Sequence, residues 1–424
     1  MEHGSSAPCP SIAPILQRST TPFEIRMLEL ETALERMLAA VPPAMGQSIP
    51  LAGAHGRILH ERIVAPLDLP VFDNSAMDGY AVHATDVAPA KPDAPVRLQL
   101  IGKVAAGETF AGEVSRGTCV RIFTGSTLPR GADAVVMQED TRVEGGEVLV
   151  LEPAKPWENV RLQGEDVKRG AVLAEPGEVL TFGRVSLVAA CGLSSVKVGQ
   201  VPLIGLLATG SELREPGQTL APGQIYESNR LGLAALLRGT GAITEILPIV
   251  ADVLGGTRAA LEDGFARCDA VVTSGGVSVG EMDFIRPALE QAGGSLDYWR
   301  VAIKPGRPFV FGRLGKKLLF GLPGNPVSAL VTFLLLVRPA VLRWQGAREV
   351  LLPRHPGVLA EPLPNPGQRR HFMRVQADDK GSVRSAGIQA SHVLSSLAVA
   401  NGLVDVPPET TLQAGSSVQV MRWE

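Results

Sequence analysis

Cysteine is scarce in this chain and is never arranged for a metal or redox function. The four cysteines, Cys9, Cys119, Cys191 and Cys268, lie far apart, and no two of them form a CxxC pair. This pattern disfavours a zinc site or a thioredoxin-like redox motif, and it favours a reducing compartment such as the cytoplasm. The seven histidines show no HExxH or similar ligand spacing either.

Long hydrophobic runs and strong net charge are also absent. The apolar run "VSALVTFLLLV" at 327–337 is too short to span a bilayer, so it predicts a buried helix. The first residues lack the basic start and apolar stretch of a secretory signal, and we expect residues 1–22 to form a mobile tail. The formal net charge is −3, so no global field would attract nucleic acid or an acidic membrane, and we expect neither partner.

The length and the rhythm of the chain indicate several domains. A chain of 424 residues is too long for one core and suits about two to four domains. Between residues 44 and 200, short apolar stretches separated by Gly, Pro and Asp predict antiparallel β-structure. From residue 201, strand–helix alternation predicts a mostly parallel sheet with both faces covered. Short strands after residue 351 predict a small β-domain, so the fold class is α/β plus β.

A helix is expected near the start of the folded part of the chain. Thr21 can cap it, Pro22 suits the first helical position, and Glu24 completes a capping box. Pro42 and Pro43 would end it.

Three glycine-containing loops follow predicted strands of the α/β segment, at residues 208–213, 273–283 and 321–328. They match neither GxGxxG nor GxxxxGK[ST], which disfavours a dinucleotide fold or a P-loop. A single loop of this kind is more often an ordinary turn. Three loops at one sheet edge, however, offer backbone N–H groups to an anion. The candidate anion-binding residues are Ser274, Gly275, Gly276, Pro323, Gly324, Asn325, Pro326 and Ser328.

Three acids, Glu212, Asp252 and Asp283, lie in or near strand-to-helix connections of the same segment. One interpretation is helix capping or dipole pairing. The other is a metal site, because carboxylates beside a phosphate would repel it unless a cation such as Mg²⁺ lay between them. The spacing favours neither interpretation over the other.

A basic cluster is expected in "YWRVAIKPGRPFVFG", which contains Arg300, Lys304 and Arg307. In one strand, Arg300 and Lys304 would share a face. They are either solvated surface charges or ligands of a phosphate or oxyanion. In the polar segment 71–82, Asp78 has the simpler interpretation of an Asx turn.

Several motifs together resemble a known family. The stretches "FDNSAMDGYA", "RIFTGSTLP", "QGEDV", "ATGSEL", "TSGGVSVGEMD", "AIKPGRP", "GLPGNPVSA" and "GIQASHVLSSLAVANGL" occur in this order. They closely resemble the molybdopterin molybdenumtransferase family, which includes bacterial MoeA and the E domain of gephyrin. The resemblance covers about residues 24–424.

The resemblance implies a four-domain chain and an elongated homodimer with shared clefts. The domains would be 23–66 joined with 161–200 (helix and dimerisation), 67–160 (inserted, β-rich), 201–350 (pterin-binding, α/β) and 351–424 (C-terminal, β). The implied activity is insertion of molybdate into adenylated molybdopterin, with release of AMP and a need for Mg²⁺. A molybdopterin adenylyltransferase would act upstream as a partner. The alternatives are that the chain is itself such an adenylyltransferase, or a non-enzymatic scaffold.

The resemblance also assigns residue roles. Asp78, Thr124 and Asp166 match site residues of the β-rich domains, and Asp283 and Lys304 match site residues of the pterin-binding domain. Arg369 and Ser391 match positions associated with molybdate. Glu212, Asp252 and Asp283 match acidic positions, and Pro323 and Pro326 match the prolines of the PGNP loop. Arg300 and Arg307 stand where bacterial relatives often have Lys.

Overall fold

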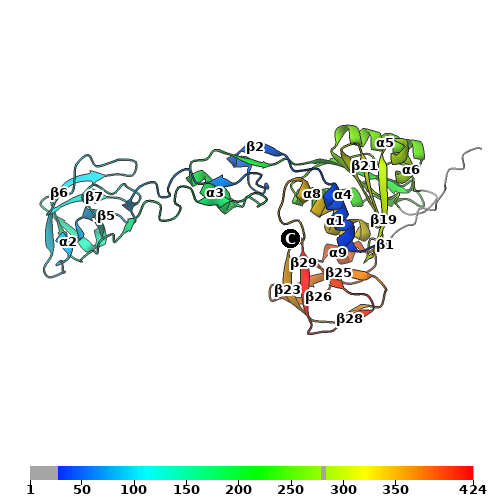
Figure 1. Ribbon diagram of the computed structural model, residues 1–424. Helices are drawn as coiled ribbons and strands as arrows, with labels where there is room; N and C mark the ends of the chain where they lie inside the picture. Colours follow the sequence, from blue (N-terminus) through cyan, green and yellow to red (C-terminus); the bar gives the residue numbers. More distant parts are fainter. Residues whose placement is uncertain (1–26, 278–282, 424) are drawn as a thin grey trace, which may run out of the picture.

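The computed structural model describes residues 27–277 and 283–423. The chain is elongated and has four parts (Figure 1). The α/β domain and the C-terminal β-domain lie together at one end, a small middle domain follows, and a β-rich domain forms the far end. The predicted fold class, α/β plus β in several domains, is confirmed.

The far domain is built on a six-stranded sheet with the order β8-β5-β7-β6-β10-β9. All its pairings are antiparallel except β6 with β7. Apolar side chains form a core on each face of the sheet. The domain is an insertion, because β4 (Asn74–Ser75) pairs with β11 (Val160–Arg161) where the chain enters and leaves. Its other elements are β5 (Gly79–Val82), α2 (Ala84–Val87), β6 (Val96–Val104), β7 (Thr118–Ile122), β8 (Ala134–Met137), β9 (Thr141–Glu144) and β10 (Glu147–Val150).

The middle domain is made from two chain segments that flank this insertion. Strand β2 (Gly46–Pro50) pairs with β13 (Ser195–Gly199), and β3 (Ile63–Val64) pairs with β12 (Val172–Ala174). Helix α3 (Phe182–Ala190) is capped by Thr181, whose hydroxyl accepts a hydrogen bond from the Arg184 N–H.

The α/β domain contains a seven-stranded sheet with the order β1-β19-β21-β22-β18-β14-β17. The pairs β1–β19, β22–β18, β18–β14 and β14–β17 are parallel, and only the two pairs involving β21 are antiparallel. The sheet is therefore mostly parallel, as the sequence predicts. Its strands are β1 (Met27–Leu28), β14 (Leu203–Ala208), β17 (Ile243–Ile246), β18 (Ala270–Ser274), β19 (Ser295–Val301), β21 (Pro308–Leu314) and β22 (Lys317–Leu322), and a short pair, β15 (Leu213–Arg214) with β16 (Ile225–Tyr226), lies outside it.

Helices cover both faces of this sheet because its strands are apolar on both sides. Ile204 and Leu206 face one core with α4 (Asn229–Gly239), whereas Leu207 faces a second core with α5 (Leu254–Arg267) and α6 (Ile285–Gln291). The run at 327–337 lies in a continuous helical stretch of α7 (Pro326–Thr332), a π-helical turn (Phe333–Val337) and α8 (Arg338–Trp344).

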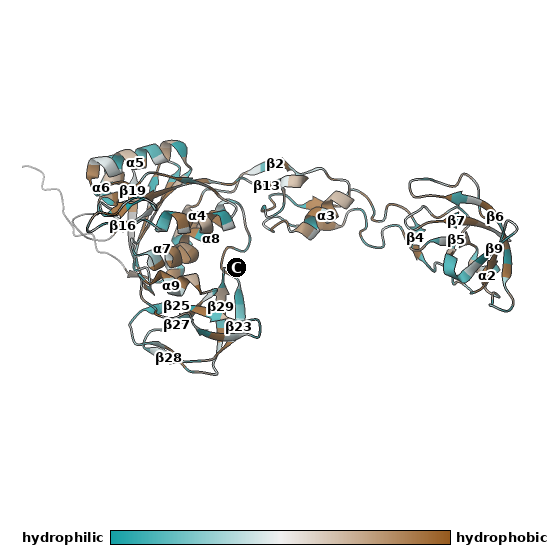
Figure 2. Ribbon diagram, turned by 180° about the vertical axis from the view of Figure 1, so that it is seen from behind, coloured by the Kyte–Doolittle hydropathy of each residue, from teal (hydrophilic) through white to brown (hydrophobic). Residues whose placement is uncertain are grey.

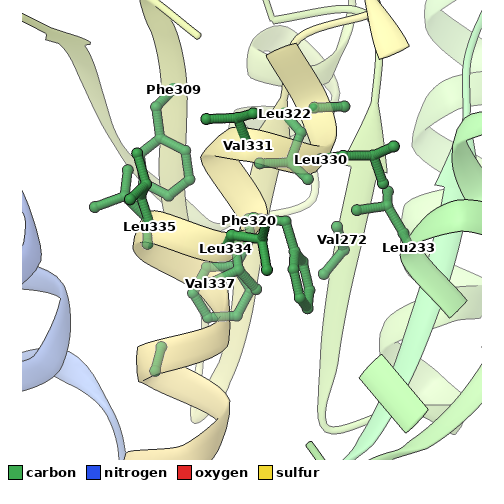
Figure 3. Close-up of a cluster of buried hydrophobic side chains, with 14 of the residues drawn as sticks. Leu233, Val272, Phe309, Phe320, Leu322, Leu330, Val331, Leu334, Leu335 and Val337 are labelled. Atoms are coloured by element: carbon green, nitrogen blue, oxygen red, sulfur yellow. The ribbon is translucent and has the colours of Figure 1, made fainter. Parts of the chain in front are cut away.

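This helical stretch is the central core helix of the domain. Residues 326–344 are apolar and long enough to cross a membrane, but 72% of the window is buried inside the protein. Leu330, Val331 and Leu334 pack against strand residues such as Phe320 (Figure 3). In Figure 2, α7 is largely brown, whereas the outer helix α5 also carries teal residues. The predicted buried helix is confirmed.

Two sequence expectations for this domain need correction. Residues 27–28 form an edge strand, and helix α1 begins only at Leu30 and ends at Ala40; Thr21, Pro22 and Glu24 lie outside the described residues. The helix packs against α8 and its side chains join the α/β core. In this chain, α1 therefore belongs to the α/β domain and not to the middle domain predicted for residues 23–66.

The C-terminal domain is a second six-stranded sheet, with the order β20-β25-β26-β23-β29-β27 and an additional β25–β27 pairing. Its edge strand β20 (Ile303–Lys304) comes from the α/β domain and pairs in parallel with β25 (Arg370–Ala377). This pairing joins the two domains along one seam. The remaining elements are β23 (Arg354–Leu359), β24 (Leu363–Asn365), β26 (Ser382–Ser385), α9 (Leu394–Ala398), β27 (Gly402–Val406), β28 (Thr410–Leu412) and β29 (Ser417–Arg422).

Candidate active site

The three predicted loops meet at the carboxyl edge of the α/β sheet. The Thr209 N–H donates to the Ser274 carbonyl at 3.1 Å, and the Gly275 N–H donates to the Leu322 carbonyl at 3.1 Å. A Cβ placed on Gly324 would lie 3.7 Å from the Cα of Gly275. The loops after β14, β18 and β22 therefore pack against one another, as parallel neighbouring strands require.

Asn229, at the start of helix α4, ties two of these loops together. Its side chain is 8% exposed. Its amide nitrogen donates to the Ser274 hydroxyl at 2.7 Å and to the Gly324 carbonyl at 2.8 Å. Sequence analysis missed this residue, although an Asn at the beginning of a helix within "ESNR" was the available signal.

Gly275 and Gly276 follow β18 in a conformation that favours glycine, with φ values of 91° and 67°. A Cβ on Gly275 would lie 2.7 Å from the Thr209 carbonyl oxygen, and one on Gly276 would lie 2.9 Å from the Thr209 hydroxyl. That hydroxyl is buried and has no hydrogen-bond partner in the described part of the chain. The backbone of this loop and the unpaired Thr209 hydroxyl therefore lie close together at the carboxyl edge of the sheet, where a ligand would bind.

The predicted acids lie around this edge but do not form one cluster. Asp252 is fixed to the first loop, because its carboxylate accepts from the Ser211 N–H and its own N–H donates to the Ser211 hydroxyl. Glu212 is exposed, and Asp283 is half-buried. Among residues 27–277 and 283–423, no group of three or more His, Cys, Asp or Glu side chains is placed to hold a metal. Glu212, Asp252 and Asp283 therefore do not form a three-carboxylate ligand set.

A site with fewer than three protein carboxylates still suits the coordination chemistry of Mg²⁺. This ion usually binds one or two protein carboxylates together with phosphate oxygens and water. A Mg²⁺ site at this edge would therefore need only one or two of the three acids.

The basic residues collect at the seam between the α/β and C-terminal domains. Lys304 is exposed and lies beside His371 in the β20–β25 register. Arg369 donates to the Ile303 carbonyl at 2.8 Å. Burial lowers the pKa of Arg369, and the positive charge of Arg307 lowers it further, so these two guanidinium groups lie near each other.

Arg300 does not share a strand face with Lys304, which corrects the sequence prediction. Arg300 is in β19 of the α/β sheet, whereas Lys304 is in β20 of the C-terminal sheet. The chain turns between them, and the Val301 N–H donates to the Arg307 carbonyl at 2.9 Å. The reason is the bend at Ala302, which ends β19 and precedes β20; the Pro305–Gly306 turn comes after both residues and leads into β21.

Two buried basic residues were missed by sequence analysis. His371 is 2% exposed, and burial, together with the charges of Lys304, Arg374 and Arg369, lowers its pKa to about 3. Arg374 is completely buried and donates to the Ser396 hydroxyl and the Ile388 carbonyl. One of its terminal nitrogens and the Nε2 of His371 have no partner within the described ranges. The seam therefore has an excess of positive charge and of unused polar groups.

The PGNP loop borders this seam. Pro323 and Gly324 lead into α7, where Pro326 occupies the first turn as predicted. Asn325 is at the N-cap position, but the described structure shows no capping bond from its side chain. The Val327 N–H instead donates to the Ser391 carbonyl at 3.1 Å, which brings Ser391 next to the first turn of α7, where Ser328 lies.

The far domain holds a second part of the predicted site. Thr124 donates to one carboxylate oxygen of Asp78 from its N–H at 2.8 Å and from its hydroxyl at 2.9 Å. These bonds, and the nearby charge of Arg121, keep the pKa of Asp78 below its usual value. Arg121 is held between the rings of Tyr80 and Phe123, at 4.9 and 5.1 Å from their centroids.

Asp166 is separate from this pair. Its N–H donates to the Leu69 carbonyl in the connection between the middle and far domains. Burial raises the pKa of the Cys191 thiol, and the charge of Asp166 raises it further. Asp166 is exposed, and its charge acts on the part of the middle domain that contains Cys191.

Within one chain, the two parts of the predicted site are far apart. Asp78 immediately precedes β5, which lies at the opposite end of the molecule from α5, α6 and β19 of the α/β domain (Figure 1). Asp78 and Thr124 cannot reach the sheet edge of their own α/β domain in this arrangement.

Comparison with known proteins agrees with this architecture. Residues 28–192 match the family model described as the MoeA N-terminal region (domains I and II). Residues 205–343 match the "probable molybdopterin binding domain" model, and residues 356–423 match the MoeA C-terminal region (domain IV).

Individual relatives match over nearly the whole chain. The molybdopterin molybdenumtransferase of Haemophilus influenzae is 38% identical over 402 residues, which is 93% of this chain and 98% of the relative. Molybdopterin molybdenumtransferase 2 of Mycobacterium tuberculosis matches to the same extent. A crystal structure of a molybdopterin biosynthesis MoeA protein from Pyrococcus horikoshii is 30% identical, with a TM-score of 0.80, and the match covers 94% of this chain and 100% of that one. The chain belongs to the molybdopterin molybdenumtransferase (MoeA) family.

Proposed function

We propose that this protein is a transferase that inserts molybdate into adenylated molybdopterin, releases AMP and forms the molybdenum cofactor. The relatives' names support molybdenum transfer to molybdopterin. The observation that carries the proposal is the junction of a glycine-rich, N–H-rich loop edge with a cationic seam. This combination suits a substrate with several phosphates and a second, small oxyanion.

The residues of this edge divide the binding work between them. The loops that contain Gly276 and Gly324 would offer backbone donors to the pterin phosphate, and Asn229 holds the Ser274 and Gly324 loops in register. Lys304 and the neighbouring arginines stabilise negative charge on the pyrophosphate as it breaks. Arg369, which is bonded to the Ile303 carbonyl at the seam, and Ser391, which lies beside the PGNP loop, place molybdate beside the pterin dithiolene.

A divalent cation completes this proposal. Asp283, with Asp252 or Glu212, would hold Mg²⁺ against the phosphates. When bound, the ion supplies charge neutralisation at the bond that breaks. The protein's own contribution is to orient these carboxylates and to keep the loop backbone close to the ligand.

The cleft is shared between two chains in this proposal. Asp78 is half-buried and Thr124 is exposed, and the two are hydrogen-bonded to each other at the far end of the molecule, away from the α/β sheet edge of their own chain. In a two-fold homodimer, the far domain of one chain can reach the α/β domain of the other, and symmetry gives two equal clefts. A molybdopterin adenylyltransferase would supply the adenylated substrate.

The free, buried state of the cysteines supports a cytoplasmic location. Within the described part of the chain, Cys119, Cys191 and Cys268 are free and buried. Burial raises the pKa of the Cys119 thiol to about 12, and burial together with Glu245 raises that of Cys268 to about 11. These thiols are held in their unreactive, protonated form.

One incubation tests the activity. The protein is mixed with adenylated molybdopterin, molybdate and Mg²⁺, and released AMP is measured. Molybdate-dependent AMP release is the expected result. ATP consumption with free molybdopterin would instead identify an adenylyltransferase. If neither reaction occurred, the protein would be a non-enzymatic scaffold.

A further inference from the structure

A cavity of about 660 Å³ lies at the opposite edge of the α/β sheet from the candidate active site. It is bordered by the amino-terminal ends of the sheet strands, near Pro202, Asp269 and Lys317. Both chain segments that connect the α/β domain to the middle domain also line it, at Pro42–Met45 and Gln200–Pro202. The cavity is therefore at the joint between two domains and is not part of the loop edge described above.

Part of the lining of this cavity is apolar and rigid. Trp344, at the end of α8, is half-buried, and Pro42, Pro43 and Pro202 lie around the same space. Trp and Pro present flat, stiff surfaces, and an indole favours stacking with another ring. Such a wall suits a planar group better than a flexible chain.

A second part of the lining is cationic. Arg313, Lys316 and Lys317 come from the hairpin between β21 and β22, whose turn uses Gly315 at φ 61°. Lys317 donates to the Cys268 carbonyl at 2.8 Å, whereas Arg313 and Lys316 are exposed. The Arg313 guanidinium lies over the Phe311 ring, 5.9 Å from its centroid. The lining has one acid, Asp269, and its carboxylate already accepts from the Leu203 N–H. The unbalanced charge therefore favours an anion.

We propose that this cavity binds an aromatic organic phosphate of the nucleoside monophosphate class. The ring would stack beside Trp344 and the prolines, and the phosphate would bind Arg313 and Lys316. A guanidinium group can bind two phosphate oxygens at once, and a mainly apolar pocket with a few charged groups is typical of a site for a small organic ligand. The occupant would contact both connecting segments and so would couple its binding to the joint between the domains.

The probe is AMP, whose binding is measured by equilibrium dialysis without pterin, molybdate or metal. Because no turnover is involved, the result does not depend on the proposed function. The test variant is Arg313→Glu with Lys316→Glu, two exposed positions at which the fold tolerates charge. Lys380→Glu, on an exposed turn of the C-terminal domain, is the matched control. The variant Lys304→Ala tests whether AMP binds at the candidate active site instead of in this cavity.

We expect the double variant to weaken AMP binding about tenfold or more, and Lys380→Glu to leave it unchanged. AMP binding that persists in Lys304→Ala would support a site away from the candidate active site. Inorganic phosphate binding about tenfold more weakly than AMP would support a role for Trp344 and the prolines in binding the ring. Three results would overturn the proposal: no AMP binding at about 1 mM, equal affinity in the double variant and the wild type, or complete loss of binding in Lys304→Ala alone.

Discussion

The close packing of the loop edge can be tested with a matched pair of glycine substitutions. Gly275 and Gly217 have the same φ, 91°, so Gly275→Ala and Gly217→Ala introduce the same backbone strain, about 1–3 kcal/mol each. They differ in their surroundings. A Cβ at 275 meets the Thr209 carbonyl oxygen at 2.7 Å, whereas a Cβ at 217 meets nothing within 4 Å.

The contact at 275 sets the size of the expected difference. Real Cβ atoms essentially never lie under 3.0 Å from such an atom, so either Thr209 or the 275–277 loop must move. Overpacking of this kind costs about 1–3 kcal/mol beyond the shared strain. The movement also separates the Ser274 and Gly324 loops that Asn229 joins, so substrate affinity should fall as well.

Two assays follow these effects. Urea unfolding monitored by tryptophan fluorescence should show Gly275→Ala to be less stable than Gly217→Ala by about 1–3 kcal/mol. AMP release should show a raised KM for Gly275→Ala and a KM near the wild-type value for Gly217→Ala. Equal losses of stability and of activity in the two variants would refute the claim that close approach of the loops shapes the site.

Further predictions concern the cationic seam. Lys304→Ala should weaken binding of the pterin nucleotide, and calorimetry should find that the loss shrinks as salt rises, because exposed charge contacts are screened; unchanged affinity at low salt would contradict this. Arg369→Ala should raise the molybdate concentration needed for half-maximal AMP release with little change in pterin affinity, and a fall in pterin affinity instead would reject the proposed division of roles. His371 has a folded pKa of about 3 against an ordinary 6.5, so the folded state binds fewer protons and stability should decline as the pH drops below about 6.5. At about pH 4 this loss of stability is roughly 3 kcal/mol. Urea titrations at several pH values should show that His371→Asn loses less stability in acid than the wild type does; an identical loss in the variant would contradict the role given to His371.

The parts of the fold that follow from local pattern were predictable. Apolar strands alternating with amphipathic helices indicated the mostly parallel sheet, and glycine-rich connections after those strands indicated the loop edge. The parallel arrangement then brings such loops together without further information, because all the carboxyl ends lie on one side.

Other features depend on contacts between distant segments. Strand β21 begins at Pro308, just after the Pro305–Gly306 turn, and a strand there between β19 and β22 was not among the sequence predictions. Helix α1 lies next to the middle domain in sequence, but its apolar face fits the core beside α8. Its location depends on packing, which periodicity does not specify.

The basic residues of the candidate site, at the seam between the α/β and C-terminal domains, show the same limit of prediction from sequence. Arg369 was identified through the family resemblance, whereas His371 and Arg374 carry no motif and acquire their role from burial beside β20. The three acids were correctly placed in the loop region, but spacing along the chain could not show that they fail to cluster.

The shared cleft is tested most directly by mixing two inactive variants. Asp78→Asn and Asp283→Asn should each be nearly inactive as homodimers. If Asp78 of one chain serves the α/β domain of the other, a mixed dimer has both lesions in one cleft and an intact second cleft. Random assortment of equal amounts makes about half the dimers mixed, so about a quarter of all clefts should be intact. AMP release by the co-expressed variants should therefore recover to about a quarter of the wild-type rate. A mixture as inactive as its parents would contradict the shared site, because acids acting within one chain leave a lesion in every cleft.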